Sequence, residues 1–185
     1  MSFPQKKNDN TMKITIKELL TDIENYTAGM RLELTGTVYT ARDQAHKRLV
    51  GLIKDKKELP IDLKNACIYY CGPCPSCPGK IIGSCGPTTS SRMDVFTPAI
   101  LDAGVKILIG KGNRNGDVKS SLIKNKALYL LATGGAGALI SKKVKSAKLV
   151  AFEDLGPEAV YRLDVEDFPL TVGIDAKGGN IFERD

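Results

Sequence analysis

The chain of 185 residues has no tryptophan, one histidine and few aromatic side chains, 6% in all. This scarcity of rings argues against a carbohydrate site or a surface on which nucleic-acid bases stack. The formal net charge of +6 would suit nucleic acid, but no groove-reading motif accompanies it, so we expect no nucleic-acid partner. A basic surplus suits a small anionic substrate or an acidic partner protein equally well.

Long apolar runs are also missing, since no stretch approaches the roughly 18 residues of a membrane-spanning helix. The first residues, MSFPQKKNDNTMK, lack the apolar core of a signal peptide. We therefore expect a cytoplasmic protein with no membrane association. Residues 1–14 are expected to be a flexible segment, and residues 15–185 to form one domain. In the cytoplasm, cysteines are expected to be free, metal-bound or catalytic rather than paired in structural disulfides.

Strand-like and helix-like segments alternate along the chain, which predicts an α/β domain with a mixed, partly parallel sheet. Helices are expected over residues 14–29, 42–58, 91–105, 117–126 and 135–144. Strands are expected over residues 31–40, 64–72, 106–112, 127–135, 148–154, 158–167 and 169–178, with Pro169 separating the last two. A long loop, residues 72–90, is rich in glycine, proline, cysteine and serine, and loops of this length are typically functional.

Part of this loop is a cluster of cysteines. They are Cys67, Cys71, Cys74, Cys77 and Cys85. The stretch CGPCPSCPG resembles part of a ferredoxin cluster motif, but Lys80 and Ile81 flank the place of the fourth ligand. Tetrahedral zinc is a second interpretation, and a proline-stiffened loop with free thiols is a third.

Two glycine motifs follow predicted strands. TGGAGALI falls short of a dinucleotide fingerprint because Ile140 stands where the third glycine belongs, and GKGN lacks the serine or threonine that follows a Walker lysine. Both predict tight turns that bring the backbone close to a ligand, which at a helix N-terminus can be an anion. Lys111 is therefore a candidate anion ligand, against the alternative of a solvated lysine at the end of a strand.

The segment YTARDQAHKRL places Arg42, Asp43 and His46 at a predicted strand-to-helix junction. Arg42 and His46 are four positions apart and share one helix face. The alternative is a surface ion pair with a capping aspartate.

The segment GPTTSSRMD places hydroxyl side chains before a predicted helix. Ser90 or Ser91 is a natural N-cap, with Asp94 as its capping-box partner. Thr88 then remains near the positive end of the helix, where its hydroxyl would lose a proton more readily than a free alcohol. Arg92 lies one turn into the helix and can bind a carboxylate bidentately.

Several segments taken in order resemble one known family. They are GTVYTARDQAHKRL, YYCGPCP, IGSCGPTTSSRMD, IGKG, ATGGAGALI, EDLGPEAVYRLDVEDFP and IDAKGGNIF. They resemble the class I (iron–sulfur) fumarate hydratase β subunit, which corresponds to the C-terminal domain of single-chain class I fumarases and is shared by the L(+)-tartrate dehydratase β subunit. The resemblance covers about residues 15–185. It implies a single swivelling β/β/α domain whose active site is completed by an α subunit carrying a [4Fe–4S] cluster.

The resemblance also implies roles for individual residues. Arg42, Arg92 and Lys111 would hold the carboxylates of fumarate or malate, and Thr88 would be the proton-abstracting base. Asp43 and His46 would support them from behind.

The cysteine loop departs from the family, whose cluster ligands belong to the other subunit. We therefore expect no metal on this chain alone, and Cys71, Cys74 and Cys77 are only minor candidates as ligands. A disulfide, an accessory metal and free thiols stay open for all five cysteines. Tartrate dehydration is the nearest alternative activity, and a stand-alone metal-binding module is an alternative from another class.

Overall fold

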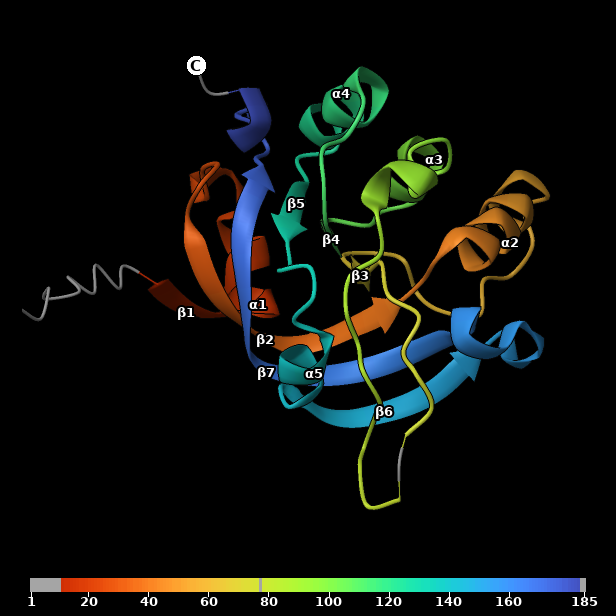
Figure 1. Ribbon diagram of the computed structural model, residues 1–185. Helices are drawn as coiled ribbons and strands as arrows, with labels where there is room; N and C mark the ends of the chain where they lie inside the picture. The colour runs from red at the N-terminus through yellow and green to blue at the C-terminus, as the bar shows by residue number, and fades with distance from the viewer. Residues whose placement is uncertain (1–10, 77, 184–185) are drawn as a thin grey trace, which may run out of the picture.

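Seven strands and five α-helices follow one another in residues 11–76 and 78–183, the part of the chain that the computed structural model describes (Figure 1). The strands are β1 Thr11–Thr15, β2 Arg31–Thr40, β3 Cys67–Tyr69, β4 Ile107–Gly110, β5 Leu128–Leu131, β6 Val144–Ala151 and β7 Val160–Ile174. The α-helices are α1 Ile16–Thr21, α2 Asp43–Lys54, α3 Thr97–Asp102, α4 Gly116–Lys124 and α5 Gly137–Ser141. Short 3-10 turns are η1 Ile23–Asn25, η2 Ser90–Met93, η3 Glu153–Glu158 and η4 Ile181–Glu183.

The strands form one mixed sheet, as the alternating pattern predicted. Strands β1 to β5 pair in parallel, whereas β7 pairs antiparallel with β2, β5 and β6. The pairings β2–β3, β3–β4, β4–β5, β5–β7 and β7–β2 close a circuit, so these five strands leave no open edge between β2 and β5. The prediction of an α/β domain with a partly parallel sheet is confirmed.

Alternate side chains of the central strands enter two separate hydrophobic clusters. In β3, Cys67 and Tyr69 belong to the cluster enclosed by the sheet, whereas Ile68 belongs to the cluster on the other face. Helices α2, α3 and α4 cover that other face (Figure 1), where Ala45 and Leu49 of α2 are fully buried. This period-two alternation is what a strand buried on both faces requires.

The segment predicted as one helix over residues 14–29 is instead β1, α1 and η1. Residues 11–15 pair with β2, placing Ile14 opposite Leu34. Thr15 then begins α1 through a capping box with Glu18, because its side chain accepts the N–H of Glu18 and its own N–H donates back to that carboxylate. Residues 11–14 of the segment expected to be flexible therefore lie in or next to the sheet, and residues 1–10 lie outside the described residues.

Pro169 lies inside one long strand, β7, rather than between two strands as predicted. It faces Glu33 of β2, while β6 pairs with residues 160–165 and β5 with residues 171–174 on the opposite edge. A proline is tolerated in that gap because neither neighbouring strand needs its missing N–H. None of the described helices is long and apolar enough to span a membrane.

Candidate active site

The candidate residues gather where the parallel strands end. Arg42 follows β2, Tyr70 follows β3 and Lys111 follows β4, and all three strands run in the same direction. The N–H of Ala41 donates to the carbonyl of Tyr69, which holds the ends of β2 and β3 together. Carboxyl ends of parallel strands are the usual place for ligands in α/β sheets.

Arg42 stands at the start of α2 and packs against the loop that follows β3. A methyl group at Gly72 would lie 2.9 Å from Cδ of Arg42 and 2.9 Å from the carbonyl oxygen of Pro157, so only glycine fits there. Nη2 of Arg42 lies 3.5 Å from Glu158 and 3.9 Å from Asp43. The alternative of a capping aspartate is wrong, because Arg42 occupies the N-cap position and the N–H of Gln44 donates to Oε2 of Glu158 at 3.0 Å.

His46 is fully buried behind Arg42. Its Nδ1 lies 2.9 Å from the carbonyl oxygen of Arg42, and its ring packs edge-on against Tyr70 at 5.3 Å between centroids. Burial lowers the pKa of His46 to about 4, so the ring is neutral at pH 7. Since a carbonyl only accepts, Nδ1 carries the proton and donates it. His46 thus fixes the first turn of α2.

The segment that carries Thr88 extends the parallel arrangement beside β4. The N–H of Thr88 donates to the carbonyl of Tyr70 at 2.7 Å, and Thr89 forms a parallel bridge with Lys111. The N–H of Ser90 donates to the carbonyl of Lys111 at 3.0 Å, and the N–H of Lys111 donates back to Oγ of Ser90 at 3.0 Å. These bonds bring Thr88 and Lys111 to the same edge of the sheet.

The predicted capping box at Ser90 or Ser91 with Asp94 is wrong. The segment forms the 3-10 turn η2 without a side-chain cap, and α3 begins only at Thr97. The hydroxyl of Ser90 is buried between the N–H of Lys111 and the phenol of Tyr129. These tertiary partners replace the local backbone partner, and a four-residue 3-10 turn gives Thr88 little of the helix dipole that the sequence suggested.

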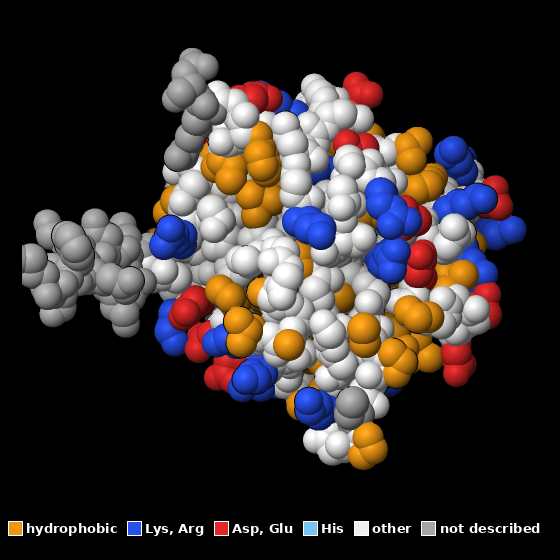
Figure 2. Space-filling view, in the orientation of Figure 1, with side chains coloured by type: hydrophobic (Ala, Val, Ile, Leu, Met, Phe, Trp, Pro, Cys, Tyr) orange, Lys and Arg blue, Asp and Glu red, His pale blue; other side chains and the backbone are white. Residues whose placement is uncertain are grey.

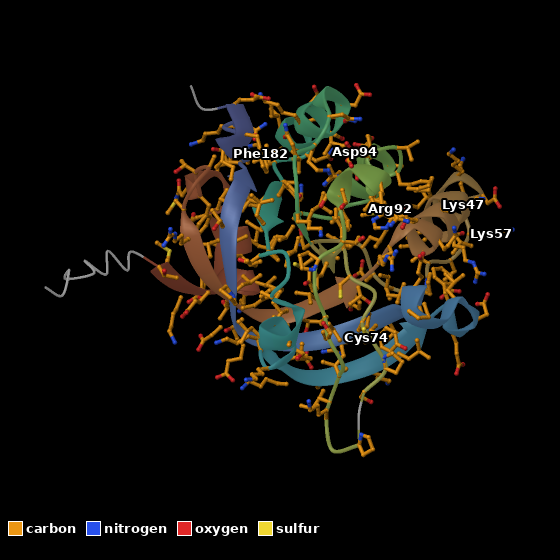
Figure 3. All side chains as sticks on the ribbon, in the orientation of Figure 1. Lys47, Lys57, Cys74, Arg92, Asp94 and Phe182 are labelled. Atoms are coloured by element: carbon orange, nitrogen blue, oxygen red, sulfur yellow. The ribbon has the colours of Figure 1, made fainter. Side chains whose placement is uncertain are left out.

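Arg92 joins the turn η2 to helix α2. Its Nε donates to Oδ1 of Asp43 at 3.0 Å, and its side chain is 50% exposed. Figure 3 shows Arg92 on the side of the molecule where η2 and the start of α2 meet. Figure 2 shows Lys and Arg side chains next to acidic ones over the same area. The two motifs singled out in the sequence are therefore in direct contact.

Lys111 lies half-buried beside the second glycine motif. A methyl group at Gly134 would lie 3.5 Å from Cδ and 4.0 Å from Nζ of Lys111. The TGG turn thus approaches the lysine side chain closely, as a tight turn next to a ligand site would. Within residues 11–76 and 78–183, Nζ of Lys111 has no hydrogen-bond acceptor or ion-pair partner.

A buried arginine that the sequence did not single out supports this edge. Nε of Arg114 donates to Asp94 at 2.7 Å and Nη2 donates to Thr97 at 2.7 Å. Its guanidinium lies over the rings of Tyr70 and Tyr129, at 5.2 and 4.9 Å. The surrounding sequence GNRNG is typical of an exposed polar loop, and nothing in it singled out Arg114.

The described cysteines lie beside this edge rather than in it. Cys67, Cys71 and Cys85 are buried, and Cys74 is exposed (Figure 3). Cys77 lies outside the described residues. Among residues 11–76 and 78–183, no three or more His, Cys, Asp or Glu side chains are placed to hold a metal ion. The suggestion that Cys71, Cys74 and Cys77 are ligands stays a prediction, because Cys77 is not among the described residues.

Comparison with known proteins gives one consistent result. A family model described as "Fumarase C-terminus" matches residues 2–185. The chain is 39% identical over 171 residues to the anaerobic class I fumarate hydratase of Escherichia coli (strain K12), covering 91% of this chain and 31% of that protein. It is 36% identical over 169 residues to the putative L(+)-tartrate dehydratase subunit beta of Methanocaldococcus jannaschii, covering 88% and 87%. The chain thus spans about a third of the fumarate hydratases and most of the tartrate dehydratase subunit.

Proposed function

The chain belongs to the fumarase C-terminal family, and from that premise we propose that it is the β subunit of a cytoplasmic class I fumarate hydratase. This hydro-lyase would add water reversibly to fumarate, giving L-malate, in a complex with an α subunit. The relative from Methanocaldococcus jannaschii is itself described as a beta subunit, which supports a partner subunit for this chain.

One observation carries the proposal: among the described residues, Arg92, four residues after Thr88, and Lys111, which pairs with the adjacent Thr89, have no acidic partners on their terminal nitrogens. In the described part of the chain, the Nη atoms of Arg92 and Nζ of Lys111 have no such partner. Fumarate and malate are dianions, and a guanidinium fork binds a carboxylate bidentately. Arg42 adds a third cation, although Glu158 and Asp43 already share its charge.

The same cations would stabilise the transition state. Removing a proton from the carbon next to a carboxylate of malate puts more negative charge on that carboxylate. Preorganised Arg92 and Lys111 side chains aimed at this charge would supply the largest electrostatic contribution. The proton would pass from the carbon to Oγ1 of Thr88, whose deprotonated form nearby cations would favour.

The [4Fe–4S] cluster implied by the resemblance is proposed to lie on the α subunit. When bound, such a cluster supplies a Lewis acid for the leaving hydroxyl group. Since the described residues of this chain offer no group of metal ligands, we assign no step through the cluster to this chain.

The decisive experiment is an assay of this chain with its α subunit and without it, on fumarate and on L(+)-tartrate. We expect the complex to hydrate fumarate and this chain alone to be inert. If the complex converts L(+)-tartrate but not fumarate, the second candidate function, tartrate dehydration, would replace fumarate hydration. The 36% identity over most of a tartrate dehydratase β subunit favours this second candidate. Stoichiometric iron or zinc in this chain, purified anaerobically without a partner, would support the stand-alone metal module instead.

A further inference from the structure

Two buried thiols lie in contact beside the candidate site. Sγ of Cys71 and Sγ of Cys85 are 3.1 Å apart, and the two residues are 1% and 0% exposed. This separation is about 1 Å longer than a disulfide bond. Neither thiol has a part in the proposed hydration.

We propose that Cys71 and Cys85 are a disulfide-forming pair that hydroperoxides oxidise, and that their bond fastens the Thr88 segment to the end of β3. The bond formation itself does not depend on the proposed hydration. Any effect of the bond on turnover does rest on the proposed function.

The backbone around both sulfur atoms is already anchored, so the bond needs only a small movement. The hydroxyl of Tyr69 donates to the carbonyl of Cys85 at 2.7 Å, and the N–H of Cys85 donates to the carbonyl of Gly137 at 3.2 Å. On the other side, the N–H of Cys71 bonds the carbonyl of Tyr69. Each cysteine is therefore held by its own backbone partner, independently of the loop between them.

Residues 74–76 and 78–81 of the loop between the two cysteines are exposed, whereas Ile82 packs into the cluster enclosed by the sheet. The loop extends away from α2, α3 and α4 toward the side of β6 (Figure 1). Its base is closed by hydrogen bonds from the N–H of Cys74 to Ser84 and from the N–H of Gly83 to Cys74. Hollows of about 430 and 620 Å³ separate it from neighbouring elements. A covalent link at residues 71 and 85 would hold the Thr88 segment in place whatever the loop does.

The chemistry balances with hydrogen peroxide as the oxidant. One thiol loses its proton and its sulfur attacks a peroxide oxygen; the O–O bond breaks, and the leaving hydroxide takes up that proton, giving a sulfenic acid and one water. The second thiol attacks that sulfur, forms the S–S bond and expels a second water. The neighbouring Cys85 thiol and burial raise the pKa of Cys71, so little thiolate is present and we expect oxidation to be slow.

The test uses the 185-residue chain carrying Cys74→Ser and Cys77→Ser, so that Cys67, Cys71 and Cys85 remain. After hydrogen peroxide, unfolding and maleimide labelling, we expect one reactive thiol instead of three. Mass spectrometry should show the loss of two hydrogens and a peptide linking residues 71 and 85. The oxidised chain should melt roughly 5–10 °C higher, and a reducing phosphine should reverse the shift.

Matched variants identify the pair. Cys67 is also buried in β3, so Cys67→Ala should oxidise like the parent chain, whereas Cys71→Ala and Cys85→Ala should keep all their remaining thiols reactive. Three reactive thiols in the oxidised parent, a link to Cys67, or sulfinic acid at Cys71 would overturn the proposal. Because thiols and melting are measured without substrate, a failed hydration assay would leave this result unaffected.

Discussion

Nε of Arg92 lies 3.0 Å from Oδ1 of Asp43, so one ion pair joins the turn η2 to the first residue of α2 across 49 positions of the sequence. The pair uses one edge of the guanidinium. In the part of the chain that the structure describes, the Nη atoms of Arg92 have no acceptor. Asp43 therefore orients the fork and leaves its two-nitrogen end for a carboxylate.

Arg92→Lys should reduce kcat/KM of the αβ complex for fumarate about 100-fold. A lysine keeps the charge, but it cannot bond Asp43 through one nitrogen and a carboxylate through two others. The loss corresponds to about 3 kcal/mol of transition-state stabilisation. Arg48→Lys is the matched control, because Arg48 also pairs with an aspartate, Asp154, on the exposed surface of α2. Unchanged kcat/KM in Arg92→Lys would show that the fork does not bind substrate.

Thr88→Ala should lower kcat by a factor of roughly 10² to 10⁴ and change KM little, because a proton-accepting group acts chiefly in the transition state. Its neighbour Thr89 is exposed and serves as the matched control, so Thr89→Ala should keep kcat within about twofold. Steady-state kinetics of both complexes measure the contrast. Equal losses in the two variants, or a loss confined to KM, would contradict the role of Thr88 as the base.

His46 should make the protein less stable as the pH falls from 6.5 toward 4. Its pKa in the folded state is about 4, whereas the unfolded chain binds a proton near 6.5. Folding therefore excludes that proton, and its contribution is complete above pH 6.5 and lost as the pH falls through 4. Between pH 7 and pH 5 we expect the free energy of unfolding to fall by about 2 kcal/mol from this residue.

Urea denaturation at both pH values measures this loss. His46→Gln has no titrating ring and is the comparison, so its stability should fall less over the same interval. The difference between the two pH slopes isolates His46 from the carboxylates, which both proteins share. Identical slopes would show that burial does not lower the pKa of His46 in the folded protein.

Much of this fold follows from local sequence patterns. The short apolar run around Ile68 predicts the buried strand β3, and the apolar stripe with Ala45 and Leu49 predicts helix α2. The parallel order then places Arg42 and Lys111 at one sheet edge. Where local signals compete, the prediction failed: Ile14 continues a helical pattern, but the capping box of Thr15 and pairing with β2 set the boundary.

The support behind the candidate site could not be predicted, because it consists of contacts distant in sequence. Ser90 has the local signature of an N-cap, yet its hydroxyl bonds Lys111 and Tyr129. Arg114 looks like a loop residue, and only the fold surrounds it with Asp94 and two tyrosine rings. Local propensity identified the motifs, whereas tertiary hydrogen bonds decided what holds them.

The bonds of Ser90 require a glycine at the end of β4, and this gives a last prediction. A methyl group at Gly110 would lie 2.0 Å from Oγ of Ser90 and 2.8 Å from Cδ2 of Tyr70. Gly110→Ala should therefore displace Ser90, leave the buried N–H of Lys111 without its acceptor, and cost about 3 kcal/mol in the free energy of unfolding. The matched substitution Gly51→Ala lies in α2 with nothing within 4 Å, so it should stabilise the protein by roughly 0.5–1 kcal/mol. Urea denaturation compares the two variants, and an equally stable Gly110→Ala would mean that the Ser90 contacts do not fix the Thr88 segment on β4.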